Sequence, residues 1–162
     1  MPLSSTGERS GQNQSATVRA AIIALIATGL FAILGQPLFR HEVFIDSDLG
    51  RYHVPIREWF SRCLASGDDY TWSPHLFCGF YLHGEGQGGF FHPWHQFLYR
   101  SCDVVTAINL EVLSSYLVLF LGMLLFLRRR FPADAALLGA LTFTFSGFTL
   151  THYPHMNHHR FT

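Results

Sequence analysis

Two aspartates, Asp46 and Asp48, are the residues of this chain best suited to chemistry. They lie near the start of a segment, residues 40–103, that is rich in aromatic residues, glycine, histidine and acids and is flanked by two apolar stretches. A carboxylate there can act as a general base, or it can simply cap the helix that follows. Because residues two positions apart point to nearly opposite sides of a strand or helix, we expect one catalytic carboxylate and not a pair.

Aromatic rings and glycines dominate the second half of this segment, from Tyr70 to Tyr99. Pro74 and Pro93 interrupt any regular period, so we expect an ordered irregular loop. Glycines between the rings let a ligand approach the backbone closely, as a sugar or an isoprenoid headgroup would require. The alternative is a belt of aromatic side chains at a membrane boundary.

Histidines are frequent enough to raise the question of a metal site. His92 and His95 are separated by Pro93, so we do not expect them to share a helical face, and the sequence has no H-E-x-x-H motif. A divalent metal is possible but not indicated, and no metal ligand is assigned. The three cysteines lack C-x-x-C spacing and are interpreted as small apolar residues, although one pair could form a disulfide in an oxidising compartment.

The composition indicates a membrane protein. Of the 162 residues 49% are hydrophobic and only 14% are charged, and the mean hydropathy is positive. The formal net charge is zero, so no strong field attracts nucleic acid, and we do not expect nucleic acid as a partner.

Three stretches are long and apolar enough to cross a ~30 Å hydrocarbon layer, which takes roughly 20 residues. We predict transmembrane helices at residues 19–39, 104–127 and 133–151. Glu111 falls near the start of the second one, where a carboxylate can still reach the headgroup region. The expected fold class is therefore all-α, a polytopic membrane protein with about three spans.

Arginine placement orients these helices. Three consecutive arginines fill the turn 128–132, and two more precede the first helix, so both flanks should be cytoplasmic. The segment 40–103 has only scattered arginines and should lie outside the cytoplasm, together with the tail 152–162. Residues 1–18 have too little apolar surface to order themselves, and we expect a disordered cytoplasmic tail.

An amphipathic helix is predicted at about residues 53–65 in the outer segment. Apolar side chains recur there at three-and-four spacing, with Trp59 among them. The opposite, polar face carries Arg57, Glu58, Ser61 and Arg62. Pro55 suits its first turn, Glu58 and Arg62 can pair four residues apart, and Gly67 can end it. The helix either lies flat at the outer membrane surface or packs on other parts of the protein.

Short motifs in the outer segment share their order and spacing with a known family. They are Asp48-x-x-x-Tyr52-x-x-Pro55, Trp72-Ser73-Pro74-His75-x-Phe77-x-Gly79 and Glu85-x-Gln87-x-Gly89-x-Phe91-x-Pro93, joined by Phe145-Ser146-Gly147-Phe148 in the third helix. In these motifs the chain resembles YfhO-like bacterial membrane proteins of the C-type glycosyltransferase superfamily. The resemblance covers about residues 20–160.

The resemblance implies an enzyme of the bacterial inner membrane that transfers a sugar from a polyprenyl-phosphate donor to an extracytoplasmic acceptor. The family's catalytic carboxylate, at the start of the first outer loop, corresponds to Asp48, and Arg51 or Arg57 could contact the phosphate. Membrane lipids and the lipid-linked sugar are then the partners. The residues expected to bind substrate are Asp46, Arg51, Tyr52, Arg57, Trp72, Glu85, Gln87 and His92.

The chain departs from the family pattern at Ser73, where asparagine is usual, and at His92, where tyrosine is common. Such enzymes are several times longer, so we interpret the chain as an amino-terminal fragment that is inactive alone and is completed by a further segment with more spans. The alternative function is a non-catalytic membrane scaffold or assembly subunit whose outer loop binds a partner or lipid. A transporter is less expected, because no charged residue lies deep in a predicted span.

Overall fold

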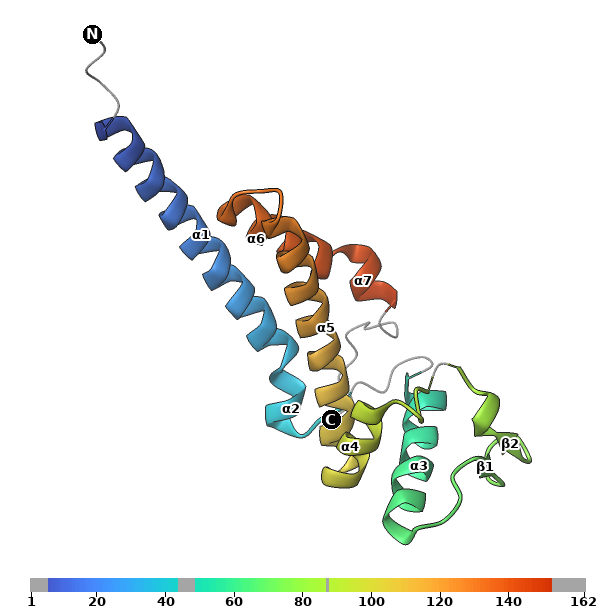
Figure 1. Cartoon of the computed structure of the whole chain (residues 1–162). Helices are drawn as coiled ribbons and strands as arrows, with labels where there is room; N and C mark the ends of the chain where they lie inside the picture. The colour runs from blue at the N-terminus through green and yellow to red at the C-terminus, as the bar shows by residue number, and fades with distance from the viewer. Residues whose placement is uncertain (1–5, 44–48, 87, 153–162) are drawn as a thin grey trace. The chain divides into compact units, whose positions relative to one another are not determined.

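The computed structural model describes residues 6–43, 49–86 and 88–152, which are predominantly helical with almost no strand, as the sequence predicts (Figure 1). Three stretches are long and apolar enough to cross a membrane, namely Gln14–Leu34, Val104–Arg128 and Ala133–Leu150. These stretches fit a multi-pass membrane protein. The described elements are α1 (Thr6–Leu34), α2 (Gln36–Arg40), η1 (Leu49–His53), α3 (Val54–Ser66), β1 (Trp72–Ser73), β2 (Phe80–Tyr81), η2 (Leu82–Gly84), α4 (Pro93–Ser101), α5 (Val104–Arg128), α6 (Ala133–Thr144) and α7 (Gly147–His152).

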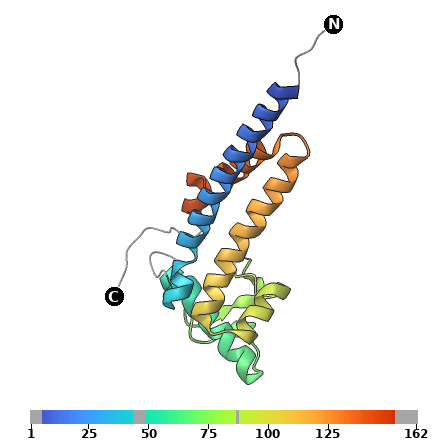
Figure 2. The same ribbon diagram turned by 90° about the vertical axis from the view of Figure 1, so that its left-hand side faces the viewer.

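The chain divides into two compact units, which we describe separately. The helical unit comprises residues 1–34 and 115–149, and the lobe comprises residues 35–114 and 150–162. In the helical unit, α1 packs along α6 (Figure 2). Arg19 of α1 pairs with Asp134 in the first turn of α6, with Nη2 2.9 Å from Oδ2. The start of α6 therefore lies beside the arginine that precedes the apolar part of α1.

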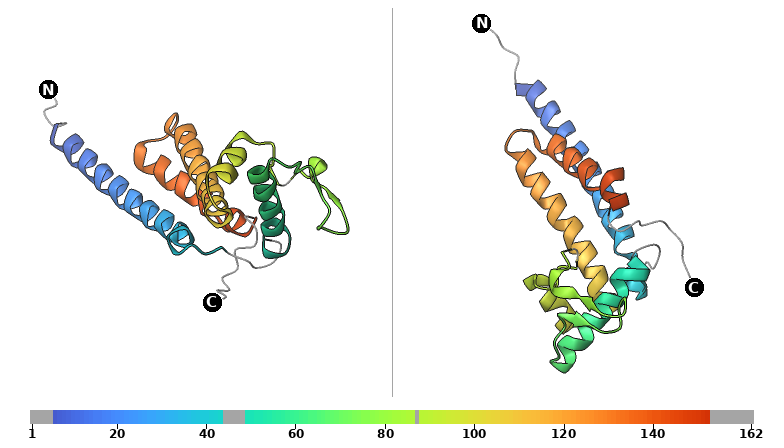
Figure 3. Two further views of the ribbon diagram at one scale, coloured as in Figure 1. Left: turned by 90° about the horizontal axis from the view of Figure 1, so that it is seen from below. Right: turned by 90° about the vertical axis from the view of Figure 1, so that its right-hand side faces the viewer.

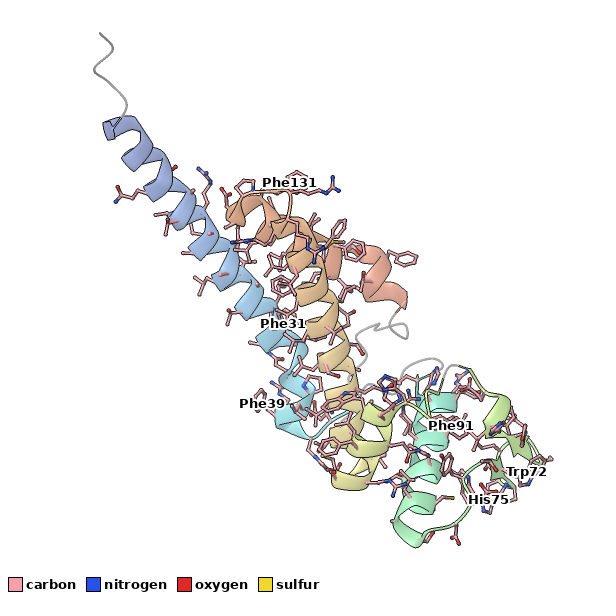
Figure 4. All side chains as sticks on the ribbon, in the orientation of Figure 1. Phe31, Phe39, Trp72, His75, Phe91 and Phe131 are labelled. Carbon is pink, nitrogen blue, oxygen red and sulfur yellow. The ribbon has the colours of Figure 1, made fainter. Side chains whose placement is uncertain are left out.

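Aromatic rings fill the interior of the helical unit. Phe31 of α1, labelled in Figure 4, makes edge-to-face contacts with Phe120 of α5 and Phe145 after α6, at centroid distances of 5.6 and 5.2 Å. Ala27 and Ala140 are buried in the same cluster, where their small side chains let the helices approach closely.

The first helix has different ends from those we predicted. It begins at Thr6, inside the segment 1–18 for which we expected a disordered tail, since extending a formed helix is far easier than starting one. It ends at Leu34, and α2 follows with Pro37 in its first turn. Proline cannot continue an existing helix, because it lacks the N–H donor and clashes with the preceding turn. The predicted helix 19–39 is therefore two helices.

The third predicted helix is also interrupted, between α6 and α7 at Phe145 and Ser146. The Ser146 Oγ accepts a hydrogen bond from the backbone N–H of Thr149 at 3.3 Å and lies 3.0 Å from its hydroxyl. Serine at this position caps the new helix by satisfying an N–H that has no partner within it. The local sequence thus explains the break inside an otherwise apolar stretch.

The lobe is built around α3, α4 and the first part of α5, and α3 packs against α4 (Figure 3). The apolar face of α3 supplies Ile56 and Phe60 to the core of the lobe, and Cys63 on the same face is also buried. The helix runs over the residues where the periodicity predicts it, Pro55 is in its first turn, and Gly67 ends it with φ of 78°. Burial of this face favours the packing interpretation of the helix over a position flat on the membrane.

The stretch from Tyr70 to Tyr99 is more regular than we predicted. It contains the antiparallel pair β1–β2, in which Trp72 is opposite Tyr81, and the helix α4. The expectation of an irregular loop is wrong here because we interpreted Pro93 as a breaker. Proline at the first position of a helix loses no hydrogen bond and already has the helical φ.

Candidate functional site

The described residues place some of the predicted site residues and not others. Asp46, Asp48 and Gln87 lie outside the described residues, so the proposed catalytic carboxylate has no described position. Leu49, the first described residue after the two aspartates, is buried, and it begins η1, which leads into α3. The site can therefore be built from the elements that directly follow the two aspartates.

A buried ion pair fixes α3 to α5. The Arg57 guanidinium donates from Nη2 to Glu111 Oε1 at 2.6 Å and from Nε to Oε2 at 3.0 Å, and each side chain is only 8% exposed. Two parallel hydrogen bonds of this kind give strong directional pairing. Glu111, which its position in the sequence would allow to reach a headgroup region, is instead held in the interior of the lobe.

Further polar groups of the lobe converge on this pair. The Tyr99 hydroxyl donates to Glu111 Oε2 at 2.9 Å, and His95 Nε2 lies 3.7 Å from Oε1. On the other side, His53 Nδ1 lies 3.2 Å from Arg57 Nη1. Burial, followed by the negative charge of Glu111, raises the pKa of the Tyr99 phenol well above its usual value. We call His53, Arg57, Tyr99, His95 and Glu111 the buried network.

The buried network extends into the turn that contains Glu85. The Glu85 carboxylate accepts a hydrogen bond from the backbone N–H of Gly88, and His95 Nδ1 lies 3.3 Å from the Gly88 carbonyl oxygen. Gly89 has φ of 63°, and a Cβ atom there would lie 2.6 Å from the His95 ring. A side chain at Gly89 would both strain the backbone and collide with His95.

Tyr52 and Glu85, two predicted substrate-binding residues, lie together in the lobe. Burial, and then the charge of Glu85 and a hydrogen bond to it, raise the pKa of the Tyr52 phenol. Tyr52 comes four residues after Asp48 in the sequence, and Glu85 is half-buried. The structure thus joins the element after the aspartates to the Glu85 turn.

The other predicted residues are more dispersed. Trp72 lies on β1, in the hairpin, where Figure 4 labels it. About half of its surface is exposed, and its ring packs against Gly79. His92 is exposed and begins α4, since its Nδ1 accepts from the backbone N–H of Trp94 at 3.3 Å. Arg51 is exposed and forms no ion pair with another described residue, whereas Arg57 is engaged by Glu111. Of the two arginines expected to contact phosphate, Arg51 is the accessible one.

Sequence reasoning missed Glu111, Tyr99 and His95 as parts of this site. Glu111 gave a usable signal, because an ionisable residue within an apolar span usually has a specific partner. The partner itself, Arg57, is 54 positions away and on what we interpreted as a solvent-facing side of α3. The sequence alone gives no indication of that pairing.

No metal cluster is formed by histidine, cysteine or acidic side chains in the part of the chain that the structure describes. Cys63, Cys78 and Cys102 are all free thiols, so the disulfide that the sequence left open is not formed. Comparison with known proteins gives no match to any protein-family profile, curated protein or solved structure.

Proposed function

We propose that the chain belongs to a membrane glycosyltransferase of the YfhO-like type, which takes a sugar from a polyprenyl-phosphate donor and passes it to an extracytoplasmic acceptor. In this proposal Asp48 is the catalytic carboxylate, and the lobe lies outside the cytoplasm of a bacterial inner membrane. The sequence motifs around Asp48, Trp72 and Glu85 are the basis of the resemblance.

One structural observation supports the proposal most: the elements that follow Asp48 are packed into the lobe. Leu49 is buried, and Arg57 locks the next helix to α5 through two hydrogen bonds to Glu111. A general base must be held within a fraction of an ångström of its productive position, which requires support from packed neighbours. In the proposal the Asp48 carboxylate deprotonates an acceptor hydroxyl, a contribution of ~10² to 10⁴ in rate.

The accessible groups nearby suit the two ends of the proposed donor. Arg51 presents an exposed guanidinium three positions after Asp48, and guanidinium binds phosphate oxygens through paired hydrogen bonds. The exposed ring of Trp72 and the half-buried pair of Tyr52 and Glu85 offer an apolar face and hydrogen-bonding groups to a sugar. Arg57 then has a positioning role, through the network that it completes.

The test is sugar transfer in membranes that contain the full-length protein. Polyprenyl-phosphate-linked hexoses carrying a radiolabelled sugar are supplied, and the label is followed from the lipid to the water-soluble or glycan fraction. Asp48→Asn should lower transfer by about 10²-fold or more, because it removes the base and keeps the shape. Asp68→Asn, at an exposed carboxylate just after α3 that has no role in the proposed site, is the control and should retain most of the activity.

The alternative is a scaffold whose lobe binds a partner, with Asp48 serving only as a helix cap. It is favoured by the closed character of the buried network, which stabilises the lobe whether or not catalysis occurs. If no member of the hexose panel is transferred above the level of membranes lacking the protein, or if Asp48→Asn transfers as well as the unaltered chain, the enzymatic proposal fails.

A further inference from the structure

Helix α4 exposes two aromatic rings that its own lobe does not cover. Trp94 is 41% exposed and Phe97 is 58% exposed, and their rings stack with a centroid distance of 5.7 Å and an interplanar angle of 22°. Leu98 and Tyr99 of the same helix are buried in the core of the lobe. The helix thus places apolar side chains both in the core of the lobe and on its surface.

A hydrogen bond places this outward face at a definite level along a membrane-spanning helix. The Trp94 indole Nε1 donates to the Ser114 Oγ of α5 at 3.0 Å. Ser114 is ten positions from Val104, at a rise of about 1.5 Å per residue. Trp94 is therefore held about 15 Å along α5 from the end at Val104.

That level lies just inside the hydrocarbon layer. α5 has 25 residues and is about 38 Å long, which exceeds a ~30 Å layer by about 8 Å. Arg128, Arg129 and Arg130 keep the far end of α5 at a headgroup region, so the surplus length falls at the Val104 end. Ser114 is then about 7 Å below the membrane boundary, within the ~5 to 10 Å depth typical of helices that lie in the interface.

We propose that α4 is the interfacial helix of this protein, and that Trp94 and Phe97 insert among the lipid acyl chains and headgroups where α5 enters the bilayer. Tryptophan suits this position because its ring is apolar and its N–H needs a partner, here the Ser114 hydroxyl. Arg100 on the same helix is exposed and can extend its guanidinium to lipid phosphates. This inference rests on the membrane-spanning character of α5 and is independent of the proposed sugar transfer.

Two other elements could have been chosen for this role, and the structure disfavours both. The apolar face of α3 is buried in the core of the lobe, with Ile56 and Phe60 at most 1% exposed. The hairpin exposes Trp72, Phe77 and Tyr81 but has no hydrogen bond to a spanning helix among the described contacts. Exposed aromatic rings alone do not fix a membrane depth, whereas the bond from Trp94 to α5 does.

The experiment uses the three tryptophans of the chain as depth reporters. Trp59→Phe with Trp72→Phe leaves Trp94, and Trp59→Phe with Trp94→Phe leaves Trp72. Each full-length variant is reconstituted into phosphatidylcholine vesicles brominated at acyl carbons near the headgroup or near the bilayer centre, and emission is compared with that in unbrominated vesicles. Phenylalanine at Trp59 is a mild change, because the Trp59 indole N–H has no hydrogen-bond partner among the described residues.

In the variant that retains Trp94, bromines near the headgroup should quench about half of the emission or more, and bromines near the bilayer centre should quench less. In the variant that retains Trp72, neither brominated lipid should change the emission, and aqueous iodide should quench it. The proposal is overturned if Trp72 and not Trp94 is quenched by brominated lipid, or if iodide reaches both equally. It is also overturned if neither quencher reaches Trp94, because another protein surface would then cover that face.

Discussion

Replacing Arg57 with leucine tests the structural role of the buried network. The change leaves the Glu111 carboxylate, 8% exposed, without the two hydrogen bonds of 2.6 and 3.0 Å that Arg57 donates. Removing one partner of a buried ion pair strands the other charge and costs about 3 to 5 kcal/mol. The Tyr99 hydroxyl still donates to Glu111, so we expect the lower half of that range for Arg57→Leu. Glu111→Leu should cost more, because it also leaves the Tyr99 hydroxyl without an acceptor.

The measurement is denaturant unfolding of the full chain in detergent micelles, followed by tryptophan fluorescence. Arg62→Leu is the matched control, since Arg62 pairs with Glu58 on the same helix at 2.8 Å but with side chains 73% and 43% exposed. An exposed pair four residues apart contributes only about 0.3 to 0.5 kcal/mol. The double variant Arg57→Leu with Glu111→Leu should be less destabilised than the sum of the two single variants.

Equal and small losses of stability for Arg57→Leu and Arg62→Leu would refute this reasoning, because the Arg57 pair would then behave as a solvated surface pair. Strict additivity of the Arg57→Leu and Glu111→Leu losses would do the same, since residues in direct contact are expected to couple by about 0.5 kcal/mol or more.

Three further predictions concern local features and use the same unfolding measurement. Gly89→Ala should destabilise the lobe by about 1 to 3 kcal/mol, because Gly89 has a positive φ and a Cβ atom there would collide with the His95 ring. Gly86→Ala is the control and should be nearly neutral, since a Cβ atom at Gly86 meets open space. Equal effects of the two changes would contradict the account of this turn. The Tyr99 phenol has a raised pKa in the folded chain, so its protonated form contributes fully to the free energy of unfolding below pH ~10. This contribution is lost as the pH rises above that value. The free energy of unfolding of Tyr99→Phe should therefore fall less steeply at alkaline pH than that of the unaltered chain. Ser146→Ala should cost about 1 kcal/mol by removing the cap of α7, and an unchanged midpoint would show that this cap is not needed.

Features set by local chemistry could be predicted from the sequence. The apolar stretches gave the three helices of membrane-spanning length, and the periodicity near Trp59 gave α3, with Pro55 in its first turn and Gly67 at its end. The pair of Glu58 with Arg62 also forms, since four-residue spacing on a helix brings such side chains together regardless of the rest of the fold.

Features set by tertiary contacts could not be predicted. Arg57 was assigned to a polar face, but its partner on α5 draws it into the core of the lobe, and no local pattern announces a contact across 54 positions. The helix α4 was missed because Pro93 was interpreted as a breaker instead of a first residue. The same error concealed the outward face of Trp94 and Phe97.

The most direct test of the account is the side of the membrane on which the lobe lies. Cys78 is exposed in the lobe, and in the variant Cys63→Ala with Cys102→Ala it is the single thiol of the chain. A membrane-impermeant maleimide should label Cys78 in intact spheroplasts, whereas Arg129→Cys in a background without other cysteines should react only after permeabilisation. Labelling of Cys78 only after the membrane is opened, or recovery of the protein in the supernatant without detergent, would contradict the membrane-spanning architecture on which the proposed function depends.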